Sequence, residues 1–140
     1  MEVSDVRRRL RGAIEQAKRR AAERRSRVEL SSREYEQFLS AVAVPAVHTL
    51  AQALIGEGHR FKVLTPGQAV RLAAEFSPDD YLEIALETEG DAPAVFVHTS
   101  RGRGRRSVES DRPLNGRIGE LTQEDVISVL LEELIPLIER

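Results

Sequence analysis

Histidines are the side chains best suited to acid–base or metal chemistry near neutral pH, because their pKa lies at about 6.5. His48 lies in an apolar run, His59 follows Gly58, and His98 lies in a run rich in β-forming residues. No His-x-x-x-His or His-Glu-x-x-His spacing would bring two of them onto one helical face. We therefore expect no metal site and no cofactor, and we expect each histidine to be a buried or partly buried side chain with a satisfied hydrogen bond.

Nucleophilic chemistry has equally little support. The chain has no cysteine, which excludes disulfides, thiolate nucleophiles and cysteine-ligated metal clusters. No serine lies in a Gly-x-Ser-x-Gly elbow or a Ser-x-x-Lys motif. These absences give an enzyme little support, and no catalytic residue is assigned.

An arginine–glycine stretch, Ser100–Ser107, is the most unusual short segment. It contains neither a complete Gly-x-Gly-x-x-Gly fingerprint nor a Walker lysine, and no aromatic residues alternate with its arginines. We favour a soluble hairpin tip between strands at residues 94–99 and 106–111. The alternative is a flexible basic loop whose backbone amides and arginines grip phosphate.

The charge distribution is lopsided. Residues 1–27 hold ten basic and four acidic residues, a net +6, whereas residues 107–140 hold three and eight, a net −5. The basic segment would neutralise phosphates nonspecifically and with strong salt dependence, because no series of Asn or Gln is placed to read bases. Alternatively, it is a solvated polar face or docks on the acidic C-terminal third, and we favour this alternative over nucleic-acid binding. The candidate nucleic-acid-binding residues are Arg7, Arg8, Arg11, Lys18, Arg19, Arg25, Arg101, Arg103, Arg105 and Arg106.

The same basic segment has a narrow apolar stripe at three- and four-residue spacing, which predicts an amphipathic helix. Its largest members, Val3, Val6, Leu10 and Ile14, are the candidate oligomer-interface residues. Such a helix gains little stability from burying alanines, so it needs either a second copy or the body of the domain to pack against. A coiled coil over three heptads would be marginal.

A second helix is predicted to begin at Ser31. Ser31 and Glu34 form a capping-box pattern, and Leu30 and Tyr35 form a hydrophobic staple around it. The helix would run to Ile55 before two glycines, and its middle is apolar nearly all round, as in a buried central helix.

Pro45 interrupts this helix and predicts a kink near residues 41–45, or a break into two helices. The apolar run 38–55 barely reaches membrane-spanning length and contains polar residues, including His48 and Gln52. We therefore expect a core helix and no membrane contact.

Short runs with period-two alternation follow, and they predict an antiparallel sheet of four or five strands. The expected strands are 61–63, 70–76, 81–88, 94–99 and, as an edge strand, 106–111. A type II turn at Thr65–Gln68 would join the first two. Residues 66–76 also fit a helix capped by Thr65, and that alternative stays open.

The C-terminal segment predicts a final helix. Thr122 and Asp125 form a capping-box variant, with Leu121 and Val126 as the staple. The residues that follow, up to Ile138, form a broad apolar face that we expect to cover the sheet.

These elements predict an α+β fold, because the strands are grouped in one run and do not alternate with helices. Residues 1–28 form a basic N-terminal helical arm, and residues 29–140 form a single α+β domain. In this scheme the central and C-terminal helices lie on opposite faces of the sheet, and the arm is an appendage.

Composition also suggests the setting. Nineteen of the 21 basic residues are arginine, which is typical of a GC-rich bacterial genome, and the basic N-terminus lacks the apolar core of a signal peptide. We expect a bacterial, cytoplasmic protein. The leading hypothesis is a non-enzymatic protein that associates with other proteins, most simply as a homodimer. The alternatives are a nonspecific nucleic-acid-binding accessory protein and a small-ligand-binding domain with a pocket between sheet and helices near His48, Tyr81 and His98.

Overall fold

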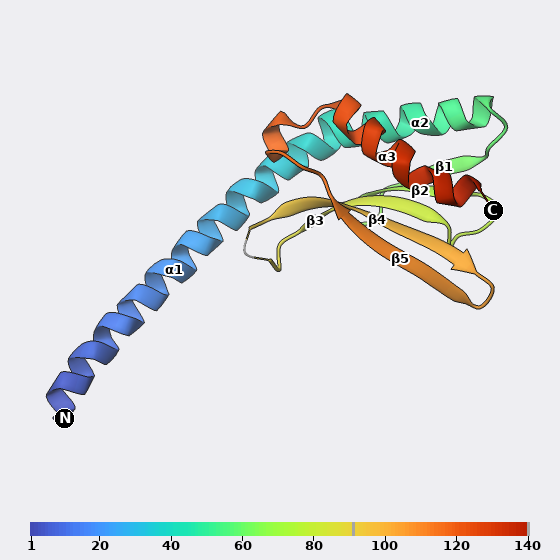
Figure 1. The fold of residues 1–140 in the computed structure, drawn as a ribbon. Helices are drawn as coiled ribbons and strands as arrows, with labels where there is room; N and C mark the ends of the chain where they lie inside the picture. The colour runs from blue at the N-terminus through green and yellow to red at the C-terminus, as the bar shows by residue number, and fades with distance from the viewer. Residues whose placement is uncertain (91, 140) are drawn as a thin grey trace.

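The computed structural model describes residues 1–90 and 92–139 and has the predicted α+β fold (Figure 1). A long N-terminal helical segment leads into a five-stranded antiparallel sheet, and a C-terminal helix ends the chain. The fold class is therefore confirmed.

The N-terminal segment is helical without a break over Val3–Gly56. It consists of α1 (Val3–Phe38), a π-helical turn η1 (Leu39–Ala43) and α2 (Val44–Gly56). The helix start predicted at Ser31 is wrong. No glycine or proline lies between residues 13 and 44, so the backbone N–H groups near Ser31 bond to carbonyls of the preceding turn and need no side-chain cap.

The π-helical turn lies immediately before Pro45. The Val44 N–H bonds to the carbonyl of Leu39, five residues back. Pro45 then occupies the first turn of α2, where its missing N–H costs least. The helix is not broken into two here, and the kink predicted at residues 41–45 stays a prediction.

The sheet is a meander with the strand order β1-β2-β3-β4-β5, and every neighbouring pair is antiparallel. The strands are β1 (Phe61–Leu64), β2 (Val70–Ala74), β3 (Tyr81–Glu87), β4 (Ala94–Arg103) and β5 (Arg106–Pro113). The count of five lies within the predicted range.

The β1–β2 connection settles the alternative that the sequence left open, because residues 70–74 form a strand and not a helix. The turn differs by one residue from the prediction, since the Ala69 N–H bonds to the Pro66 carbonyl and Gly67 has a φ of +57°. The strand ends at Ala74, before Phe76, whose side chain is exposed.

The C-terminal helix α3 (Gln123–Ile138) follows a short 3₁₀ turn, η2 (Ile118–Glu120). Both bonds of the predicted capping box are present. The Asp125 N–H donates to Thr122 Oγ1 at 3.2 Å, and the Thr122 N–H donates to Asp125 Oδ2 at 2.9 Å. The N-terminal boundary of this helix is confirmed.

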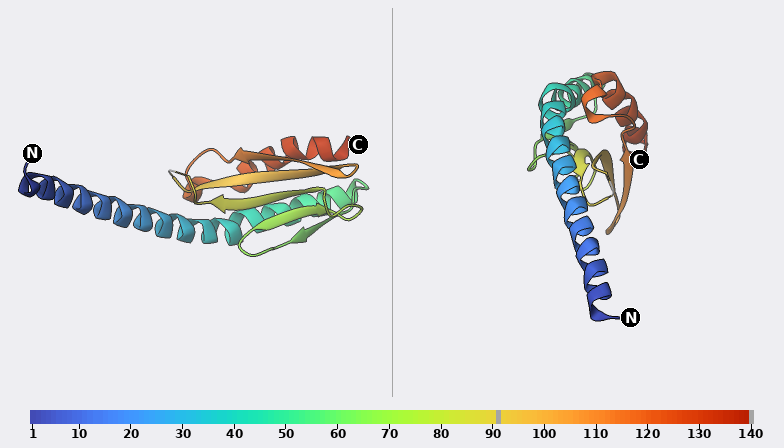
Figure 2. Two further views of the ribbon diagram at one scale, coloured as in Figure 1. Left: turned by 90° about the horizontal axis from the view of Figure 1, so that it is seen from below. Right: turned by 90° about the vertical axis from the view of Figure 1, so that its left-hand side faces the viewer.

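The layering differs from the prediction. Helices α2 and α3 contact one another and lie side by side on one face of the sheet, leaving the other face uncovered (Figures 1 and 2). The strands explain this. Leu82 and Ile84 of β3 are buried towards the helices, whereas Glu83 and Glu87 on the other face would lose their hydration under a second helix.

One stretch within the continuous helix Val3–Gly56 is long and apolar enough to cross a membrane by length and composition. Of that stretch, 39% is buried inside the structure. Within α2, the buried residues lie on the face that packs on β1 and β2, as in a core helix. They are Ala46, Val47, Leu50, Ala51 and Leu54.

Candidate association surface

The arm, residues 1–28, projects away from the rest of the protein (Figures 1 and 2). Every residue from 1 to 27 is exposed. At about 1.5 Å per residue, the arm extends over about 40 Å. The predicted interface residues form an exposed apolar stripe along it: Val3 is 74% exposed, Val6 47%, Leu10 57% and Ile14 45%.

The basic side chains of the arm are also in solvent. The predicted nucleic-acid-binding residues Arg7, Arg8, Arg11, Lys18, Arg19 and Arg25 all lie there and are exposed. Within residues 1–90 and 92–139, the ion pairs join Arg71, His98 and Arg112 to carboxylates, and none involves the arm. Docking of the arm on the acidic C-terminal third of its own chain is not observed.

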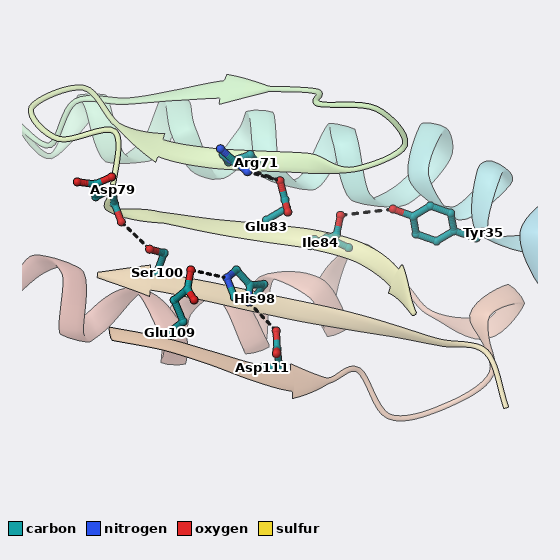
Figure 3. A network of polar contacts seen from close by, with 9 residues as sticks. All are labelled: Tyr35, Arg71, Asp79, Glu83, Ile84, His98, Ser100, Glu109 and Asp111. Atoms are coloured by element: carbon teal, nitrogen blue, oxygen red, sulfur yellow. Dashed lines mark hydrogen bonds and ion pairs between the residues drawn. The ribbon is translucent and has the colours of Figure 1, made fainter. Parts of the chain in front are cut away.

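Tyr35 fixes the base of the arm to the sheet. Its ring is buried, and its hydroxyl donates to the carbonyl of Gln68 at 2.6 Å and lies 3.4 Å from that of Ile84 (Figure 3). Burial raises the pKa of Tyr35 to about 12, and the nearby charge of Glu83 adds to the increase. The sequence placed Tyr35 at a helix start, but it is a core residue between α1 and the sheet.

The arginine–glycine stretch belongs to the β4–β5 hairpin, as favoured from the sequence, but the predicted end of the strand at residue 99 is wrong, because β4 continues to Arg103 and only residues 104 and 105 form the tip. Arg103 and Arg106 are the last paired residues, and Gly104 between them has a φ of +62°. A Cβ at Gly102 would lie 3.3 Å from Oδ1 of Asp80, so glycine permits the strand to approach the start of β3 closely. The hairpin is therefore held by the sheet.

The four arginines of the hairpin do not share one environment. Arg101 is half-buried, and its guanidinium donates to the Pro136 carbonyl in the last turn of α3 at 3.4 Å. Arg103, Arg105 and Arg106 are exposed at the tip. The tip and the free end of the arm lie at opposite ends of the molecule (Figures 1 and 2). The predicted nucleic-acid-binding residues therefore form two separate clusters.

A cavity of about 550 Å³ lies beside the hairpin. Residues of opposite charge line it, including Arg101, Arg103, Asp79 and Glu139, together with Ser77 and Pro136. It has no buried apolar floor, so it lacks the usual character of a small-molecule pocket.

The uncovered face of the sheet carries a row of polar side chains contributed by the four strands β2 to β5 (Figure 3). Arg71 Nη2 lies 2.9 Å from Glu83 Oε1, and the guanidinium carbon of Arg71 lies 3.9 Å from the centroid of the Tyr81 ring. His98 Nδ1 lies 2.6 Å from Asp111 Oδ1, so this nitrogen donates to the carboxylate. Sequence reasoning did not find this row, although the strand alternation places all of these residues on the outward face.

His98 is thus a partly buried histidine with a hydrogen-bond partner, as expected, and Glu109 lies 3.6 Å from its Nε2. For His48 and His59 the expectation is wrong, because both are exposed and lie elsewhere, His48 on α2. Among the residues described, no group of three or more His, Cys, Asp or Glu could hold a metal ion.

The pocket predicted between sheet and helices near His48, Tyr81 and His98 is not formed. Tyr81 and His98 are neighbours, with ring centroids 5.9 Å apart, but they lie on the uncovered face of the sheet, whereas His48 lies on the helical layer. A cavity of about 200 Å³ adjoins His98 and Phe96, which is less than the roughly 300–1,000 Å³ typical of ligand pockets.

Helix α3 has an exposed outer stripe, namely Leu131, Ile135 and Ile138, which are 49%, 54% and 39% exposed. We expected the whole apolar face of this helix to cover the sheet. The buried side of α3 is formed by Val126, Leu130, Leu134 and Leu137. The width of the apolar face could have signalled a second contact, since one sheet covers only one side of a helix.

No protein-family model, curated protein or solved structure matches this chain in the comparisons.

Proposed function

We propose that this protein is a non-enzymatic association protein of the bacterial cytoplasm, and that the arm makes it a homodimer. The single observation that carries the proposal is the exposure of the apolar stripe on a helix that projects from the domain.

The physics of a lone helix supports this proposal. A helix without tertiary contacts is marginally stable in water, and most helices in proteins are stabilised by packing an apolar face. Among residues 1–90 and 92–139, nothing covers the stripe formed by Val3, Val6, Leu10 and Ile14. Burying these half-exposed side chains would contribute on the order of 1 kcal/mol each, which is enough for pairing to stabilise the arm.

Light scattering coupled to gel filtration tests the proposal. The full-length protein at micromolar concentration should have twice the 15.7 kDa mass of the chain. The double variant Leu10→Asp/Ile14→Asp puts two charges into the stripe and should be monomeric with the circular dichroism of the domain retained.

The matched control is Gln16→Asp/Ser26→Asp, which adds the same two charges outside the stripe and should stay dimeric. A monomeric mass for the unmodified protein, or equal masses for both double variants, contradicts the proposal.

A second candidate function is nonspecific nucleic-acid binding. It is favoured by one observation: the basic residues of the arm are exposed, and none makes an ion pair with the described part of the chain. An unpaired +6 segment attracts a polyanion strongly at low salt, because binding to phosphates releases counterions.

Fluorescence anisotropy with a labelled random duplex tests this second function. The affinity should fall steeply between about 50 and 200 mM salt. Arg7, Arg8 and Arg11 can be replaced by glutamine. The slope of log affinity against log salt concentration should then become less steep by about one for each phosphate that the arm no longer neutralises. Absence of binding at 50 mM salt rules out this function. Because the arm and the hairpin tip are separated, replacing Arg103 and Arg105 tests whether the tip binds phosphate on its own.

A further inference from the structure

The outer stripe of α3 is a second exposed apolar surface, and the described part of the chain does not cover it. Leu131, Ile135 and Ile138 are spaced i, i+4 and i+7, so they lie along one side of the helix. The arm carries its own stripe at helical spacing. Two helices with matching apolar stripes can pack by fitting the ridges of one into the grooves of the other.

The charges around the two stripes are opposite. Within its bounds α3 contains acidic residues and no lysine or arginine, and Glu124 and Glu132 are exposed. The arm holds ten basic and four acidic residues. Arg112 forms ion pairs with both Glu132 and Glu133 and so offsets part of this acidic surface, whereas none of the ion pairs among the described residues involves Glu124.

The arm cannot reach the α3 of its own chain. Helix α1 runs without interruption from Val3 to Phe38 and points away from α3 (Figures 1 and 2). The complementary surfaces can therefore meet only between two molecules.

The two symmetric alternatives bring like charges together. An arm-to-arm pair would place two helices of net charge +6 in contact, and an α3-to-α3 pair would place two acidic helices in contact. Like charges across a helix interface are unfavourable, whereas opposite charges set partner and orientation.

We propose that the arm of one copy docks on the outer stripe of α3 of a second copy, and that the exchange is reciprocal, which closes a two-fold dimer. This inference rests on the proposed self-association and specifies its geometry. Reciprocal exchange creates two equal interfaces, and closure distinguishes the dimer from an open chain of molecules.

Disulfide trapping tests the pairing directly, because the chain has no native cysteine. A Leu10→Cys chain is mixed with a longer, tagged Ile135→Cys chain under mild oxidation, so that the three possible linked pairs differ in mass. Both positions are exposed, so neither substitution threatens the core. The disulfide between Leu10→Cys and Ile135→Cys chains should be the main product. When a Gln16→Cys chain replaces the Leu10→Cys chain, the yield of the mixed disulfide should be at least about tenfold lower.

The other outcomes separate the inference from the proposed function. If two Leu10→Cys chains link to each other as the main product, or if the protein is dimeric but the mixed pair does not form, the α3 interface is wrong while self-association stands. A protein that remains monomeric and forms no linked pair overturns both, and binding of that monomer to a duplex favours the nucleic-acid function.

A charge substitution provides a second measurement. Leu131→Lys should weaken dimerisation at least about tenfold, because it removes an apolar side chain from the interface and places a cation opposite the basic arm. Gln52→Lys adds the same charge on the exposed side of α2 and should leave dimerisation unchanged. Equal dimerisation constants for the two variants contradict the inference.

Discussion

The carboxylate of Asp80 accepts a hydrogen bond from the Gly102 N–H at 2.7 Å. Asp80 is completely buried and lies one residue before β3, whereas Gly102 lies near the tip of the β4–β5 hairpin. Ser100 adds a second hydrogen bond in this region, since its hydroxyl donates to the Asp79 carbonyl at 2.8 Å (Figure 3). These bonds make the arginine–glycine hairpin an ordered extension of the sheet.

Replacing Asp80 by alanine should therefore destabilise the protein by about 1–3 kcal/mol, because the Gly102 N–H loses its acceptor. Chemical denaturation measures this change. Asp80→Asn retains an oxygen acceptor at the same position and should cost less than Asp80→Ala. Equal stability of the alanine variant and the unmodified protein would show that this bond does not hold the hairpin.

Stability should fall at alkaline pH because of Tyr35. The folded-state pKa of about 12 lies above the ordinary value of 10.0. Below pH 10 the phenol is protonated in both states and stability is unaffected. Between pH 10 and 12 the unfolded state loses the proton first, so folding loses about 2–3 kcal/mol as the pH rises.

The Tyr35→Phe variant isolates this contribution. It should be less stable than the unmodified protein at pH 8 by about 1 kcal/mol, because the Gln68 carbonyl loses its donor. The difference should shrink or reverse as the pH approaches 12. Urea denaturation of both proteins at several pH values measures this difference. If the difference in stability stays constant from pH 8 to 12, titration of Tyr35 is not the cause of the alkaline loss.

The N-terminal cap of α3 contributes a third measurable effect. Thr122→Ala removes the side-chain oxygen that accepts from the Asp125 N–H and should cost about 1 kcal/mol in stability. Thr122→Ser keeps that oxygen and should stay within a few tenths of a kcal/mol of the unmodified protein. Equal losses in the two variants would assign the effect to the methyl group and not to the cap.

Backbone conformation at Gly104 provides a fourth prediction. Gly104 has a φ of +62°, which is unfavourable for alanine, so Gly104→Ala should destabilise the hairpin by about 1 kcal/mol. Gly56→Ala is the matched control, because Gly56 ends α2 and a Cβ there meets nothing within 4 Å. The control should be neutral or stabilising. Thermal unfolding of both variants checks the difference, and equal shifts contradict the assignment.

Local signals in the sequence predicted the sheet and the C-terminal helix well. The alternation around Leu82 and Ile84 identified β3, and the Thr122–Asp125 pattern identified the start of α3, because both depend on residues within one element. The β4–β5 hairpin was also predicted from its glycines, but its tip is shorter than expected, because residues 101–103 pair with β5.

Features that depend on packing between elements were predicted less well. The pattern at Ser31 resembles a helix start, but the chain lacks a residue that would stop the preceding helix. The alternation in β3 marks one face of the sheet as polar, but the contact between α2 and α3 on the other face depends on packing between elements, which no local period encodes. The charge of the arm could not show whether the arm is exposed. The same basic residues are compatible with docking on the acidic α3 and with projection into solvent.

Amide hydrogen exchange of residues 3–27 at two protein concentrations tests most directly whether the arm is the association element. At concentrations well below the dimerisation constant, the arm should exchange almost as fast as an unfolded peptide, because its helix has no tertiary contacts. At high micromolar concentration, protection of the same amides should increase at least about tenfold while the amides of β3 and β4 change little. Protection of residues 3–27 that does not depend on concentration would contradict self-association through the arm.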